Sequence, residues 1–213
     1  MTIYQPVSYL LATLFILNGL VPLTAKTFSF DDEKCHIEVP DGWSEQKVEG
    51  NKISVVNADQ TKSFTMRIAQ TGQNLTLDNA SFIKGFESSM VANGVTITDR
   101  QHVPLAGLDA YTVDSTQIAP AGTVYNRMMV TLANGYAYGL NTSKLNSKPS
   151  EDDELNGIIK SFAFIGEPVL PQSEDPMDKV GYYIGVFVGV LAVICIFKWI
   201  FRRKQQRSQT ATT

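Results

Sequence analysis

The sequence predicts an α+β protein in which two amphipathic helices sandwich an antiparallel β-sheet, followed by a C-terminal single transmembrane helix. Three observations predict this architecture. Apolar and polar residues alternate along several short runs, as in strands with one buried face. In two other segments the apolar residues recur at helical spacing. Residues 180–201 form an apolar block of spanning length near the end of the 213-residue chain.

An earlier apolar run, LLATLFIL (10–17), predicts a secretory signal peptide over residues 1–25. Ala25 offers a small residue for cleavage before Lys26. The run is shorter than the roughly 20 residues that span a bilayer, which favours cleavage. The residues before the run include no Lys or Arg, so an uncleaved N-terminal anchor stays open as the alternative.

Residues 26–165 are predicted to form the folded domain, which begins with short strands. In the fourth of these, Phe64, Met66 and Ile68 share one face by period-two alternation. The loop DQTK (59–62) predicts a hairpin between the third and fourth of these strands. The strands are TFSF (27–30), CHIEVP (35–40), KISVVNA (52–58) and SFTMRIAQ (63–70).

The periodicity then changes to that of a helix over residues 78–93, with Thr76 or Asp78 expected to cap its start. The Asn93–Gly94 pair suits a left-handed end. Its apolar positions are Phe82, Ile83, Phe86 and Met90.

Four longer strands are expected next, joined by hairpin turns at Gly107 and at Asn134–Gly135. Because hairpins connect neighbouring strands, the sheet is predicted to be antiparallel. The strands are VTITDRQHV (95–103), LDAYTVDSTQI (108–118), TVYNRMMVTL (123–132) and YAYGLNT (136–142).

A second helix is predicted to start at Ser150, with Asp153 completing a capping box. Acidic residues fill positions 151–154, where the helix dipole favours negative charge. Its apolar stripe consists of Leu155, Ile158, Ile159 and Phe162.

Three stretches, IEVPDGW (37–43), VPLAGLDAYTVD (103–114) and NGIIKSFAF (156–164), resemble the PsbP-like group of small α/β domains. The resemblance covers about residues 28–165. It implies an antiparallel sheet between helices, and binding or scaffolding rather than catalysis. The matching positions carry over no functional residues.

Charge predicts the topology of the chain. Residues 166–179 contain three prolines and no apolar period, which indicates an extended linker. Residues 26–179 hold 13 basic and all 21 acidic residues, a net charge of −8, whereas the tail 202–213 is basic. Basic flanks stay cytoplasmic, so the tail is predicted inside and the acidic domain outside. An acidic domain also argues against nucleic acid as a partner.

Catalytic and metal-binding signatures are missing from the sequence. It has two histidines, His36 and His102, on different predicted strands, whereas a zinc site needs three or four converging ligands. We therefore predict no cofactor, no metal and no catalytic residues. Cys35 is expected to be a buried free thiol, with pairing between chains as the alternative.

Arg67, Tyr111, Tyr125 and Arg127 are the candidate pocket residues, because each lies on a predicted strand where it could line one face of the sheet. The alternative for the arginines is a structural one, in which each covers the sheet or pairs with an acidic side chain.

Within residues 180–201, Gly185 and Gly189 continue a four-residue spacing that begins at Gly181. This spacing places three glycines on one helix face, which favours close packing against another helix. Self-association of the anchor, or docking to a membrane partner, is the hypothesis that follows.

The sequence thus predicts a membrane-anchored extracytoplasmic binding or accessory module that recruits a protein or peptide partner and is not an enzyme. Two alternatives stay open: an envelope assembly or maintenance factor that acts like a holdase, and an enzyme with a carboxylate and tyrosine site. The family resemblance favours a bacterial cell membrane, with the domain in the periplasm and the C-terminus in the cytoplasm. A eukaryotic secretory host is the alternative.

Overall fold

The computed structural model describes residues 24–172 of the protein. The expected signal peptide (except for its last two residues), the anchor at 180–201 and the tail at 202–213 lie outside this range. Neither α-helix between residues 24 and 172 is long and apolar enough to cross a membrane.

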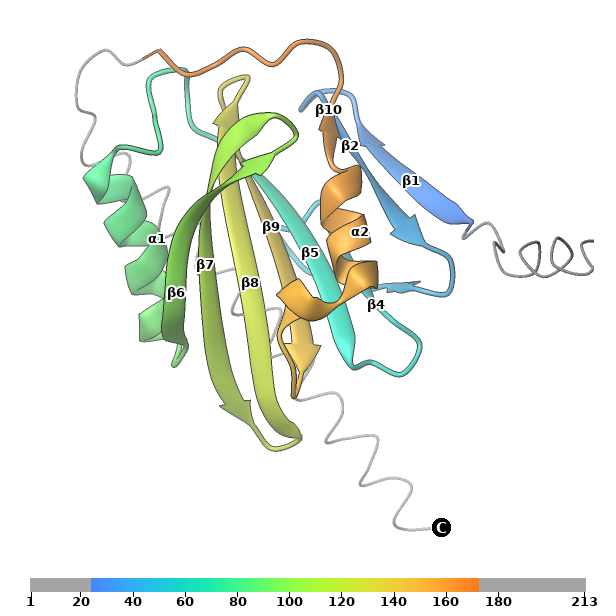
Figure 1. Cartoon of the computed structure of the whole chain (residues 1–213). Coiled ribbons are helices and arrows are strands. Elements are labelled where there is room, and N and C mark those ends of the chain that lie inside the picture. The colour runs from blue at the N-terminus through green and yellow to red at the C-terminus, as the bar shows by residue number, and fades with distance from the viewer. Residues whose placement is uncertain (1–23, 173–213) are drawn as a thin grey trace, which may run out of the picture.

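The described residues form an α+β fold in which all paired strands are antiparallel, as predicted (Figure 1). Seven strands make the main sheet, in the order β3-β4-β5-β9-β8-β7-β6, and three make a small sheet, β1-β2-β10. The elements are β1 (Ala25–Phe30), β2 (Cys35–Pro40), β3 (Ser44–Glu45), β4 (Ile53–Val56), β5 (Lys62–Gln70), α1 (Ala80–Ala92), β6 (Thr96–Leu105), β7 (Leu108–Ala119), β8 (Gly122–Ala133), β9 (Tyr136–Leu145), the 3₁₀ helix η1 (Pro149–Glu151), α2 (Asp153–Ser161) and β10 (Ala163–Phe164).

Helix α1 packs against one face of the main sheet, which we call the α1 face. Its apolar stripe meets side chains from β7, β8 and β9 in one buried cluster. The cap of α1 differs from the prediction, because the side chain of Asn79 accepts the N–H of Phe82 at 2.9 Å. Asn79 is the N-cap, and not Thr76 or Asp78, because its carboxamide lies three residues before that N–H.

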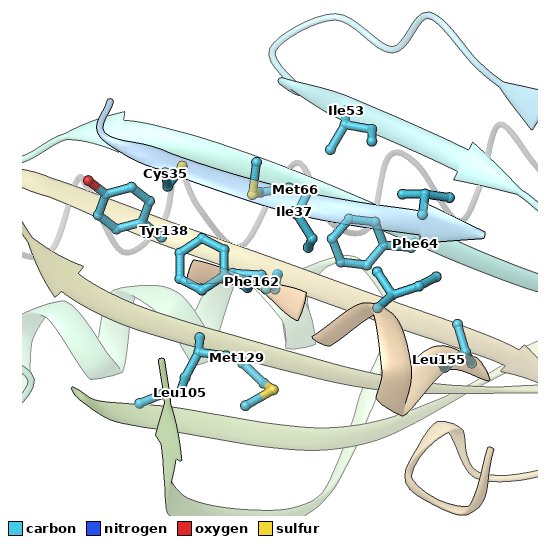
Figure 2. Packing of buried hydrophobic residues seen from close by; sticks show 14 of the residues in the cluster. Cys35, Ile37, Ile53, Phe64, Met66, Leu105, Met129, Tyr138, Leu155 and Phe162 are labelled. Carbon is cyan, nitrogen blue, oxygen red and sulfur yellow. The ribbon is translucent and has the colours of Figure 1, made fainter. Parts of the chain in front are cut away.

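The opposite face of the main sheet, the α2 face, is covered by α2 and by the small sheet. Figure 2 shows their shared core, in which the rings of Tyr138 of β9 and Phe162 after α2 are adjacent and Phe64 of β5 belongs to the same cluster. The small sheet was not predicted. It forms because β2 pairs with β1 on one side and with β10 on the other, after more than 120 intervening residues.

Helix α2 begins at Asp153 and not at Ser150, which corrects the predicted start. The side chain of Asp152 accepts the N–H of Leu155 at 3.1 Å and is the N-cap, while Ser150 lies in η1. Asp152 also forms ion pairs with Lys62 of β5 at 2.9 Å and with Lys144 of β9 at 2.6 Å. One carboxylate thus caps α2 and fixes it to two strands.

The first half of the expected linker is attached to the domain. Val169 exchanges two hydrogen bonds of 2.8 Å with Asn134 in the β8–β9 turn. The N–H of Gln172 donates to the carbonyl oxygen of Gln73, also at 2.8 Å, just before α1. Figure 1 shows this segment crossing the end of the main sheet where β8 and β9 meet. Of the predicted tether, only residues 173–179 lie beyond these contacts.

Cys35 lies fully buried on β2. Burial, aided by the negative charge of Glu33 and opposed by Lys52, raises the pKa of its thiol to about 12. We expect folded full-length protein to resist iodoacetamide at Cys35 at pH 8, whereas urea-unfolded protein reacts within minutes. Mass spectrometry of the Cys35 peptide measures this. A Cys35-linked dimer on a non-reducing gel, in a Cys195→Ser background, would instead support pairing between chains.

Candidate functional site

The structure divides the four candidate pocket residues between the two faces of the main sheet. Arg67 shares the α1 face with Ala69, and Tyr111 packs in the α1 cluster. Arg127 shares the α2 face with Met129, and Tyr125 lies two residues before it. The four side chains therefore do not line a single pocket.

Tyr111 belongs to a polar cluster that fastens α1 to the sheet. Its hydroxyl donates to Glu87 of α1, which also accepts two hydrogen bonds from Arg100 of β6, at 2.8 and 2.9 Å. These bonds from Arg100 are the main reason that the pKa of Glu87 is lowered. Burial, followed by the hydrogen bond to Glu87, raises the pKa of Tyr111. Tyr111 is thus a structural residue.

Arg67 is buried on β5, with 7% of its surface exposed. The loop between β3 and β4 lies directly over it. A Cβ atom at Gly50 would sit 3.3 Å from both terminal nitrogens of the guanidinium, and Gly50 has a φ of +80°. The positive φ favours glycine there, a side chain would also crowd the guanidinium, and the loop keeps Arg67 away from bulk solvent.

Tyr125 lies at a cavity of about 310 Å³ on the α2 face, and Arg127 is joined to this cavity only through its ion pair with Asp114. Strands β6, β7 and β8 form one side of it, and the segment that enters η1 forms the other. Its lining includes Asp99, Asp114, Thr116, Tyr125, Lys148 and Ser150. This cavity is the candidate functional site.

Asp114, on the lining of the cavity, forms an ion pair with Arg127. The guanidinium of Arg127 donates from two nitrogens to the two carboxylate oxygens of Asp114, both at 2.7 Å. The pKa of Arg127 is raised, chiefly by these hydrogen bonds and further by the charges of Asp114 and Asp99. Asp99 pairs directly with Asp114 across β6 and β7. Among the described contacts Asp114 forms the hydrogen bonds to Arg127, and Asp99 acts on it through its charge alone.

A second hollow of about 430 Å³ lies at the opposite edge of the sheet, around the β3–β4 loop. Its lining alternates in charge, with Glu45, Lys47, Glu49 and Lys52. None of the candidate pocket residues lines it, and its charges offset one another locally. We therefore centre the site on the cavity beside Tyr125.

Sequence reasoning missed three residues at this site: Asp99, Asp114 and Ile118. The pairing of Asp99 with Asp114 depends on an irregularity in the β6–β7 register between Ile97 and Asp99, which nothing in the residue pattern marks. Ile118 could have been found, because period-two alternation places it on the same face as Thr116. It lies beyond the part of that face that α2 covers.

The two histidines do not meet. His36 lies on β2, while Nδ1 of His102 on β6 is 2.7 Å from a carboxylate oxygen of Asp109. Within residues 24–172, no three His, Cys, Asp or Glu side chains gather in a way that could hold a metal ion.

No protein-family model matches the sequence, and no curated protein matches it. Solved structures do. The solution structure of cyanobacterial PsbP (CyanoP) from Synechocystis sp. PCC 6803 matches with a TM-score of 0.55 and 13% identity, over 71% of this chain and 98% of that one.

Two further matches are weaker. The Ran-binding protein Mog1p of Saccharomyces cerevisiae has a TM-score of 0.45 and 10% identity, over 67% of this chain and 96% of its own. LpqN of Mycobacterium tuberculosis, involved in cell envelope biogenesis, has a TM-score of 0.44 and 14% identity, over 67% and 84%. Identities this low establish the fold alone. The described residues form a PsbP-like α/β domain.

Proposed function

We propose that the protein is a membrane-anchored, extracytoplasmic binding module that recruits a protein or peptide partner and carries out no catalysis. The PsbP-like domain supplies the binding surface. Residues 180–201 supply the anchor, and the signal peptide supplies export. The proposed location is a bacterial cell membrane, with the domain on the periplasmic side and the tail in the cytoplasm.

The observation that carries this proposal is the exposure of Ile118. Its side chain is 91% exposed, more than any other exposed large hydrophobic among the described residues. It lies on β7 two residues beyond Thr116, which lines the cavity. An isolated apolar side chain beside a polar cavity is suited to a small protein interface, in which an apolar contact and a polar pocket are filled together.

The arrangement of the carboxylates argues against an enzyme with a carboxylate and tyrosine site. Both oxygens of Asp114 accept hydrogen bonds from Arg127, which stabilises the ionised carboxylate and makes it a weaker base for a substrate proton. Asp99 is exposed on the rim, where water is not excluded. The hydroxyl of Tyr111, on the other face, is held by Glu87.

The distribution of exposed apolar side chains favours specific recognition over a holdase. Besides Ile118, the large ones among residues 24–172 are Val91 on α1 and three residues near the chain's exit, Ile165, Val169 and Leu170. Ile118 on β7, Val91 on α1 and the group near the exit lie on different elements, whereas a holdase needs one continuous apolar surface.

The linker contacts place the exit of the chain at the end of the domain opposite to the cavity. The chain leaves the domain at the β8–β9 end, beside Asn134, while the cavity and Ile118 lie toward the β7–β8 turn. Strand β8 has 12 residues, which correspond to roughly 40 Å between these ends. Residues 173–179 can extend at most about 25 Å. In this proposal the recruiting end is therefore held away from the bilayer.

The anchor is proposed to contribute to association as well. The glycines at 181, 185 and 189 lie outside the described residues, so their contribution rests on their spacing. Replacing Gly185 with Ile should weaken self-association, or association with a membrane partner, in a membrane two-hybrid assay. Unchanged association would remove this part of the proposal.

Affinity capture from native membranes tests the proposed function. Full-length protein should recover one defined partner after crosslinking, and Ile118→Asp should reduce that recovery about tenfold, because a charge replaces the apolar contact. Val91→Asp is the matched control, since Val91 is also an exposed apolar residue (58%) but lies on α1. Equal recovery with both variants would contradict a partner site at Ile118.

A further inference from the structure

The cavity next to Ile118 carries one carboxylate, that of Asp99, that no ion pair among the described residues holds. Asp99 and Asp114 face each other on adjacent strands, and Arg127 donates from Nε and Nη2 to Asp114. Like charges placed directly opposite one another across two strands destabilise a sheet. Arg127 offsets one carboxylate, and Asp99 is left without a counterpart among the ion pairs of the described residues.

The other walls of the cavity suit a planar cation. Tyr125 lines it with an aromatic ring, and Thr116 and Ser150 lie nearby with hydroxyl groups. Lys148 is also on the lining, but it is exposed and forms none of the described ion pairs. A guanidinium can stack on a tyrosine ring while it donates two hydrogen bonds to a carboxylate.

The size of the cavity restricts its occupant. Its volume of about 310 Å³ is at the lower limit of pockets that enclose small-molecule ligands. It suits a single long side chain better than a whole ligand. Arginine is among the residues that most often anchor protein interfaces in pockets of this kind.

We propose that this cavity binds an arginine side chain of the partner, next to an apolar residue that packs on Ile118. Asp99 accepts hydrogen bonds from the partner's guanidinium, and Tyr125 stacks on it. The Asp114–Arg127 ion pair holds the strand next to Asp99 in place. The domain's net charge of −8 over residues 26–179 assists the approach of such a basic segment. This inference rests on the proposed function and names the chemistry of the partner.

Peptide selection on the full-length protein in nanodiscs tests the inference. A phage library of random 12-residue peptides is panned against the wild-type protein, and enriched peptides are synthesised and measured by biolayer interferometry. We expect arginine beside Leu, Ile, Val or Phe to be enriched. Asp99→Asn should weaken binding of these peptides about tenfold, and Tyr125→Leu by a similar factor.

Asp32→Asn is the matched control, because Asp32 is also an exposed aspartate but lies in the β1–β2 turn. It should leave binding unchanged. Asp99→Asn should fold with a melting temperature at or above that of the wild type, because it relieves repulsion with Asp114. A loss of binding by this variant would therefore not come from unfolding.

Three results would overturn the inference. Enriched peptides without arginine or lysine would do so, as would basic peptides that bind Asp99→Asn as tightly as the wild type. Either result would leave the proposed function intact if binding still depends on Ile118. A selection that yields no binders would count against both proposals.

Discussion

Replacing Phe162 with alanine is expected to lower the free energy of unfolding by about 3–5 kcal/mol, because it removes a large ring from a closed core. Phe162 is 2% exposed, and its ring centre lies 5.8 Å from that of Tyr138 and 5.2 Å from that of Phe164. It is also the residue at which α2 ends and the chain enters the small sheet. Its loss should loosen α2 and β10 together.

Urea denaturation of the full-length protein in detergent, followed by near-UV circular dichroism, measures this loss. Phe162→Leu should lose much less, because leucine fills most of the space. Phe164→Ala is a second comparison, since Phe164 belongs to the same aromatic group but is only partly buried. A Phe162→Ala variant as stable as the wild type would contradict a shared core between α2, the small sheet and the main sheet.

Replacing Asp152 with alanine is expected to cost about 3 kcal/mol, the second largest effect. The carboxylate is 6% exposed, caps α2 and pairs with Lys62 and Lys144. Its removal leaves an open helix end and takes the ion-pair partner from Lys144, while Lys62 keeps Glu154 at 2.8 Å. Asp152→Asn should lose less than Asp152→Ala, because asparagine keeps the cap. Asp153→Ala, one residue later and exposed, should change stability by less than about 1 kcal/mol.

Asp152 also predicts a loss of stability in acid. Burial alone would raise its pKa, but hydrogen bonds from Lys144, Lys62 and the N–H of Leu155 outweigh it and lower the pKa to about 2. The folded state therefore binds this proton less readily than the unfolded state. The resulting stabilisation, about 2 kcal/mol, is present above pH 5 and is lost as the pH falls towards 2. In Asp152→Asn this part of the acid dependence should disappear.

Local patterns in the sequence predicted most of the domain's elements. The helical stripe ending at Met90 and the one ending at Phe162 both form helices, and the four long strands lie where alternation placed them. The small sheet was missed because β10 has two residues and pairs with Cys35 and His36 across most of the chain. No local pattern contains such a distant pairing.

The site was predicted only in part, for a physical reason. Arg67 and Arg127 lie on strands whose two faces are both covered, by α1 on one side and by α2 with the small sheet on the other. Alternation between apolar and polar residues then no longer distinguishes the faces. The sequence placed the two arginines together, whereas the register places them on opposite faces. Tyr125 and Arg127 lie on one face of β8, because they are two residues apart on one strand.

Photocrosslinking at position 118 tests the central claim, that the end of the domain beyond the cavity recruits a protein partner. Benzoylphenylalanine replaces Ile118 in one full-length variant and Val91 in a matched one, and both are irradiated in native membranes. We predict one defined crosslinked species from position 118 that is missing from position 91. No crosslink at position 118, or the same mixture from both positions, would contradict the claim.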